Sequence, residues 1–143
     1  MSDGFYYRSG PKDVTRVPIA SGTVIEVGDL LKLSSGRAAK MATTTDNLTF
    51  LGVAAEAHRA VDPSGDISVY PPNGQTAFEY PLDAATDIVY GAPLQWNAAQ
   101  ALKGSSTDPI ATAVRAQLQA TKVWCVFRLN AVSASLGDIG DAS

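Results

Sequence analysis

Hydrophobic and polar residues alternate over short stretches of this chain, which is the pattern of half-buried β-strands. Residues 67–70 (ISVY) and 76–80 (TAFEY) show the alternation clearly, and Pro or Gly residues separate such stretches. The pattern predicts many short strands joined by tight turns. We therefore expect an all-β domain, folded as a small compact β-barrel or sandwich.

The stretch from residue 22 to 57 holds the clearest succession of such strands. Residues 23–27 (TVIEV) favour a strand because most of them are β-branched, and Gly28-Asp29 then turns the chain into residues 30–33 (LLKL). A further turn and a short strand lead through a polar loop to residues 50–57 (FLGVAAEA). Nothing in this stretch indicates a reactive centre.

The second half of the chain repeats this pattern at an offset of 63 residues. Laying Gly91 on Gly28 aligns seven further positions of similar type. These pairs are Thr86 with Thr23, Ile88 with Ile25, Tyr90 with Val27, Leu94 with Leu31, Trp96 with Leu33, Ala101 with Ala38 and Lys103 with Lys40. After a loop that departs from the offset by two residues, 114–118 falls on 53–57. The sequence therefore predicts pseudo-repeated halves.

Residues 109–119 allow two interpretations. Asp108-Pro109 is a good helix start, and the apolar positions that follow have helical spacing, so one short helix could cover 109–119. The repeat favours a strand instead. The next stretch, 122–129 (KVWCVFRL), has apolar residues on both faces and predicts a strand at the centre of the core.

The pattern divides the chain into three segments. Residues 1–20 mix aromatic residues with Gly and Pro and predict an extended N-terminal arm, removable without unfolding the body. Residues 21–130 form the single β domain. Residues 131–143, rich in small residues, predict a flexible C-terminal tail.

Charge and composition narrow the classes of partner. The 143 residues include eleven basic and fourteen acidic ones, a net charge of -3, with no basic block, which argues against binding of nucleic acid or an anionic membrane. No window is apolar over the roughly 18 residues needed to span a bilayer. Cys125 is the single cysteine and lies in an apolar run, which predicts a small buried side chain and a reducing cytoplasm as the place of synthesis.

Candidate chemistry is sparse. His58 is the single histidine and lies in an Ala-rich strand end and turn, without a nucleophile motif beside it. Its neighbours Glu56, Asp62 and Asp66 match no zinc or calcium spacing, so a solvated turn is the preferred interpretation. We expect no catalytic, cofactor-binding or metal-binding residues.

Four motifs together resemble the small capsid decoration (cement) proteins of tailed bacteriophages. They are residues 22–31 (GTVIEVGDLL), 50–57 (FLGVAAEA), the second turn at 89–91 (VYG) and the closing strand end at 126–129 (VFRL). The resemblance covers roughly residues 14 to 130. It implies a compact β-tulip-like barrel, often a homotrimer, that binds the outer surface of the capsid and stabilises the expanded shell by bridging major capsid proteins. The protein would be made in the host cytoplasm and end on the capsid exterior.

Proteins of that family often have a terminal segment that becomes ordered on the capsid surface. The resemblance therefore implies that the N-terminal arm makes the capsid contacts. These contacts are Phe5, Tyr6, Tyr7, Arg8 and Arg16. Two other classes stay open: a head-fibre base or glycan-binding module whose exposed Tyr and Trp residues meet sugars, and a small β-barrel hydrolase or accessory enzyme subunit with a cleft around His58.

Overall fold

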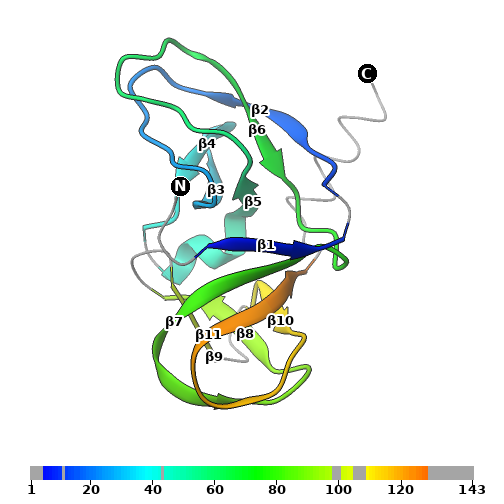
Figure 1. Ribbon diagram of the computed structural model, residues 1–143. Coiled ribbons are helices and arrows are strands. Elements are labelled where there is room, and N and C mark those ends of the chain that lie inside the picture. Colours follow the sequence, from blue (N-terminus) through cyan, green and yellow to red (C-terminus); the bar gives the residue numbers. More distant parts are fainter. Residues whose placement is uncertain (1–4, 11, 43, 98–100, 105–108, 129–143) are drawn as a thin grey trace.

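The chain is almost entirely β-structure in the computed structural model (Figure 1). The structure describes residues 5–10, 12–42, 44–97, 101–104 and 109–128. These residues form eleven strands and one 3-10 helix, η1 (Thr44–Thr49), and none of their helices is long and apolar enough to cross a membrane. The all-β prediction is confirmed. The C-terminal tail expected at 131–143 lies outside the described residues.

Five strands close into a barrel in the order β7, β11, β10, β8, β9. The closure is made by a parallel pairing of β9 with β7, at Leu102 and Leu82. A sixth strand, β1 (Tyr6–Ser9), pairs with β7 beside the barrel. The barrel strands are β7 (Ala77–Ile88), β8 (Pro93–Trp96), β9 (Leu102–Gly104), β10 (Ala111–Ala113) and β11 (Gln117–Phe127). Residues 109–119 thus contain strands and no helix, as the repeat favoured.

The first half of the chain forms a second sheet above the barrel (Figure 1). Its strand order is β2, β6, β5, β3, β4, and the described residues of β2 and β4 approach each other without pairing. The strands are β2 (Thr15–Ile19), β3 (Leu30–Ser34), β4 (Arg37–Lys40), β5 (Phe50–Ala54) and β6 (Gly65–Tyr70). The sheet therefore curls in the same way as the barrel but stays open.

The two sheets have the same strand order, which confirms the predicted repeat. Strands β2 to β6 correspond in turn to β7 to β11. The turn glycines Gly28 and Gly91 have positive φ angles of 93° and 88°, as the tight corner requires. Gly28 N–H donates to the Ala54 carbonyl at 2.9 Å, and Gly91 N–H donates to the Ala113 carbonyl at 2.8 Å. The same local corner is thus built twice.

The predicted alignment slips after this corner. Leu31 pairs with Lys40, whereas Leu94 pairs with Gly104, so Gly104 stands where the offset placed Lys103. The reason is the turn: Ser35-Gly36 joins β3 to β4 in two residues, and the connection from β8 to β9 is longer. Ala54 corresponds to Ala113, because each accepts the N–H of the corner glycine of its own half. The predicted match of 53–57 with 114–118 is therefore displaced by two residues.

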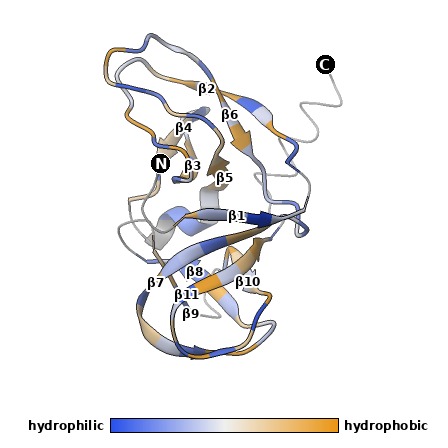
Figure 2. Cartoon of the chain, in the orientation of Figure 1, coloured by the Kyte–Doolittle hydropathy of each residue, from blue (hydrophilic) through white to orange (hydrophobic). Residues whose placement is uncertain are grey.

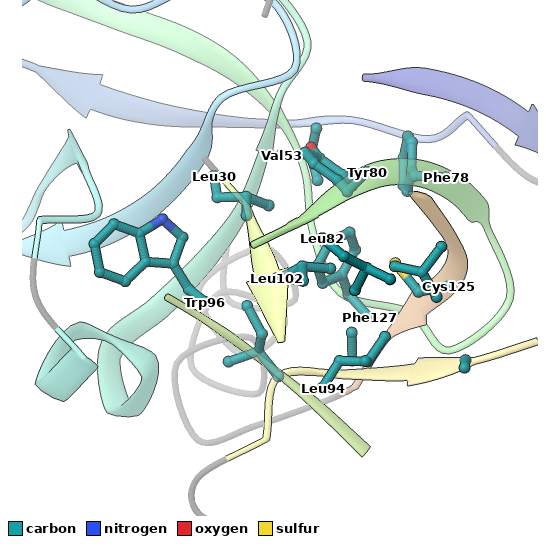
Figure 3. Close-up of a cluster of buried hydrophobic side chains, with 14 of the residues drawn as sticks. Leu30, Val53, Phe78, Tyr80, Leu82, Leu94, Trp96, Leu102, Cys125 and Phe127 are labelled. Atoms are coloured by element: carbon teal, nitrogen blue, oxygen red, sulfur yellow. The ribbon is translucent and has the colours of Figure 1, made fainter. Parts of the chain in front are cut away.

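Strand β5 is buried on both faces and separates two hydrophobic cores. Phe50 and Val53 pack into the barrel core, while Leu51 and Ala54 pack into the core of the curled sheet. Figure 3 shows Val53 and Leu30 beside the barrel side chains. Strict alternation would separate Phe50 from Val53, but the pairing with β3 shifts register between Leu31 and Lys32, and this irregularity in β5 lets both point into the barrel core. Gly52 fits between them, where a Cβ atom would lie 2.3 Å from the Tyr70 carbonyl oxygen.

The closing strand is covered less completely than the sequence predicts. Cys125 and Phe127 of β11 are buried in the barrel (Figure 3), as is Val123. Trp124 and Val126, on the other face of the strand, are only half-buried. Of the strands that the structure describes, the one with every residue buried is β5. The expected centre of the core therefore lies at β5, and β11 is a wall of the barrel.

The prediction of a separate N-terminal arm is wrong for the described part of residues 1–20. Strand β1 pairs with β7 and strand β2 pairs with β6, and Phe5 is only 4% exposed. Gly and Pro residues there separate two short strands, and Pro18 lies in β2 at an edge of its sheet, where the loss of an N–H is tolerated. Removal of residues 1–20 would thus take two strands from the fold.

The two corner glycines test whether Phe5 is docked in the core. A Cβ atom on Gly28 would lie 2.4 Å from Phe5 Cδ1, whereas one on Gly91 would meet nothing within 4 Å. Gly91→Ala should therefore cost about 1–3 kcal/mol for its backbone conformation alone. Gly28→Ala should cost about 1–3 kcal/mol more because of the steric overlap. Urea unfolding measures both free energies.

The cause of the difference is checked in a Phe5→Ala background. There the cost of Gly28→Ala should fall to that of Gly91→Ala, because the overlapping ring is gone. Equal costs for the two glycines in the parent protein would show that Phe5 does not occupy this place.

Candidate partner-binding surface

Strand β1 presents two different faces because its side chains alternate. Phe5, just before the strand, and Tyr7 point inward: the Phe5 ring lies 5.6 Å from the Phe78 ring, and Tyr7 meets Phe78 edge-on at 6.1 Å. Tyr6 and Arg8 point outward and are exposed. Figure 2 shows the hydrophilic end of β1 beside a hydrophilic part of β7.

Strand pairing extends the outward face of β1 across the barrel. Tyr6 pairs with Glu79 of β7, and Glu79 pairs in turn with Trp124 of β11. Three residues far apart in the sequence therefore form one row across three strands. Tyr6 is 44% exposed, Trp124 is half-buried, and the Glu79 side chain is 13% exposed.

Three basic side chains lie on the two rings of this row. The guanidinium carbon of Arg8 is 5.0 Å from the Tyr6 ring centroid and 5.0 Å from that of Trp124. Arg115 lies 3.9 Å from the Trp124 ring, and Lys122 Nζ lies 5.3 Å from the Tyr6 ring. Contacts of this kind hold cations over aromatic faces and restrain long side chains. We call the set Tyr6, Arg8, Glu79, Arg115, Lys122 and Trp124 the Trp124 face.

The carboxylate at the centre of the Trp124 face is already bound. Arg8 Nη2 donates to Glu79 Oε1 at 2.6 Å, and the indole N–H of Trp124 donates to Glu79 Oε2 at 3.0 Å. Glu79 thus neutralises Arg8 and fixes the Trp124 ring. Among the described residues, neither Arg115 nor Lys122 has an acidic group within ion-pair distance, so the face carries an excess of positive charge.

The five predicted contact residues separate into three groups. Tyr6 and Arg8 belong to the Trp124 face. Phe5 and Tyr7 pack in the barrel core, with Lys12 Nζ 4.1 Å from the Tyr7 ring. Arg16 lies on the other sheet. The sequence did not indicate Glu79, Arg115, Lys122 or Trp124, because strand pairing brings them to Tyr6.

Arg16 serves the structure of the curled sheet. Its Nη1 donates to Glu56 Oε1 at 2.6 Å and to Ser68 Oγ at 2.8 Å, and its Nη2 donates to the Asp66 carbonyl at 2.9 Å. The same Glu56 oxygen accepts the backbone N–H of Ser68 at 2.8 Å. Arg16 thereby ties β2 to β6, and most of its hydrogen-bonding capacity is used within the chain.

His58 connects two backbone segments. Its Nδ1 lies 2.6 Å from the Thr23 carbonyl and its Nε2 lies 3.0 Å from the Pro63 carbonyl. Both partners are acceptors, so only the doubly protonated ring donates to both. The hydrogen bond to Thr23 and then that to Pro63 raise the pKa of His58 above its ordinary value of 6.5. The ring is thus a structural link between the two segments.

The other groups weighed for chemistry also have structural partners. Asp62 accepts the backbone N–H of Arg59 at 2.7 Å, which lowers the pKa of its carboxyl. Burial raises the pKa of the Cys125 thiol, which disfavours its reactive thiolate form. Within the described ranges, no three His, Cys, Asp or Glu side chains are grouped to hold a metal ion.

Comparison with known proteins gives a likeness in fold. No family model matches the chain. No curated protein matches it either. The chain is similar to the crystal structure of the head fiber gp8.5 N base in bacteriophage phi29, with 17% identity and a TM-score of 0.52. The match covers 80% of this chain and 94% of that one. At this identity the likeness shows a shared fold.

The His58 link predicts a pH dependence of stability. Because the pKa of His58 is raised in the folded chain, its contribution is fully present below about pH 6.5 and is lost as pH rises through the folded pKa. The thermal midpoint should therefore fall between pH 6 and pH 8.5 in the parent protein and change less in His58→Gln. The ring protons of the single histidine report its pKa directly by NMR.

The opposite slope is expected from Asp62, whose contribution is lost only as pH falls through its lowered pKa. The two groups therefore act in separate pH windows. A midpoint equally sensitive to pH in His58→Gln and in the parent would contradict the link.

Proposed function

We propose that this chain is a structural protein of a phage virion that binds the outer surface of the capsid and stabilises the expanded shell by bridging major capsid proteins. The observation that carries the proposal is the likeness in fold to the phi29 head fiber base over 94% of that chain. The resemblance of four sequence motifs to those of capsid decoration proteins supports the same class of function. Its place in the virion would be the capsid exterior.

The build of the molecule supports a mechanical role. Two cores share β5, and the second half closes into a barrel, so the body is suited to carry load between neighbours. We infer a binding function without an active site and without a cofactor. We also infer a homo-oligomer, with a trimer favoured, because the resemblance to capsid decoration proteins implies one.

The base of a larger head fibre is the second candidate, and the likeness in fold to the phi29 head fiber base favours it. In that role the chain would attach a fibre or a glycan-binding module to the shell. Binding of the isolated protein to a glycan array would support this candidate.

The proposal is tested with purified chain and expanded capsids that lack it. The chain should co-sediment with these capsids and raise their thermal disruption temperature, because many weak contacts act together on one shell. Unexpanded shells serve as the control and should bind less. Light scattering after size exclusion gives the mass of the free protein. A chain that stays in the supernatant at micromolar concentration would rule out the proposal.

A further inference from the structure

The Trp124 face differs in charge from the rest of the chain. Three of the eleven basic residues and one of the fourteen acidic residues lie on it, so eight basic and thirteen acidic residues remain elsewhere. Four of those acidic residues lie outside the described part of the chain, so the described remainder has a net charge of -1 beside a face of +2. Separation of charge of this kind steers a partner of opposite sign to one side of a protein.

The cations of the face are held ready for a partner. The guanidinium carbon of Arg115 lies 3.9 Å from the Trp124 ring centroid, and no ion pair among the described residues uses the Arg115 N–H groups. Arg115 and Lys122 are both exposed. Restraint by the rings reduces the side-chain entropy that is lost on binding. Tyr6 adds exposed aromatic area next to these cations.

The chemistry inside the face indicates which anion fits it. A carboxylate, that of Glu79, already lies between Arg8 and the Trp124 indole N–H at hydrogen-bond distances. The same Glu79 carboxylate, at the centre of the face, disfavours a polyphosphate backbone. A short acidic protein segment needs few cations and is not repelled over a long contact.

We propose that the Trp124 face binds a carboxylate-rich surface of a partner protein, with Arg115 and Lys122 as its charged contacts and Tyr6 and Trp124 as its apolar floor. If the function proposed above holds, this acidic surface lies on the outside of the shell. Phe5, Tyr7 and Arg16 do not contact the partner, because they are used within the fold.

The test is binding of labelled poly-L-glutamate at low salt to the full chain and to the variant Arg115→Glu/Lys122→Glu. The matched control, Arg37→Glu/Arg59→Glu, makes the same charge change at exposed positions outside the Trp124 face. The parent and the control should bind alike. The variant of the face should bind at least about tenfold more weakly, since it replaces two attractive contacts with two repulsive ones. Circular dichroism and urea unfolding check that each variant is folded.

A second readout locates the ligand. Trp96 is 4% exposed and Trp124 is half-buried, so acrylamide quenching of the chain reports mainly Trp124. Poly-L-glutamate should protect this fluorescence in the parent and not in Arg115→Glu/Lys122→Glu. Equal binding by that variant and the parent, or tighter binding of DNA or heparin than of poly-L-glutamate, would overturn the proposal.

Capsid binding by the same variants separates this proposal from the broader one. If the parent binds shells and the variant of the face does so equally well, the Trp124 face is not the contact and the inference fails, although the capsid function stands. If poly-L-glutamate binding follows the face but no form binds shells, the capsid function fails while the choice of an acidic partner stands.

Discussion

The double burial of strand β5 is the constraint on which the rest of the fold depends. Each half of the chain supplies a curled sheet, and neither core is complete without β5, since Phe50 belongs to one and Leu51 to the other. Burial of one large apolar side chain contributes roughly 1.5–3 kcal/mol, so a single strand that buries several of them on both faces connects the two halves strongly. The two sheets therefore behave as one body, and a polar residue anywhere in β5 would weaken a core.

The internal repeat explains the architecture, and the differences between its two halves explain the surface. Both halves keep the same strand order and the same glycine corner, with N–H to carbonyl bonds at Gly28 and Gly91. The first half stays open, and the Phe5 ring covers its corner glycine, Gly28. The second half closes at Leu82 and Leu102, and a Cβ atom on its corner glycine, Gly91, would meet nothing within 4 Å. Strand β1 has no counterpart in the repeat. The Trp124 face thus arises where an added strand meets the closed barrel, so the two halves differ in the surface that they carry.

The hydrophobic pattern and the positions of glycine predicted those features of the fold that depend on neighbouring residues. Strand periodicity gave the fold class, and the corner glycines revealed the repeat, because their positive φ angles restrict both positions in the same way. Register was predicted less well, since the lengths of the two hairpin turns differ and a loop leaves little trace in the hydrophobic pattern. The Trp124 face depends on the pairing of Tyr6 with Glu79 and of Glu79 with Trp124, and no short-range signal specifies such partners.

The N-terminal residues connect the core of the fold to its exposed surface. Gly and Pro near β1 and β2 suggested an arm outside the body, yet the alternation of Phe5 and Tyr7 with Tyr6 and Arg8 is a strand pattern with one buried face. The buried rings hold β1 against β7, and this anchoring fixes where Tyr6 and Arg8 lie. An arm that ordered only on a partner would lose conformational entropy at each encounter. Here folding has already ordered the segment, so binding through its aromatic and basic side chains would not carry that entropy cost.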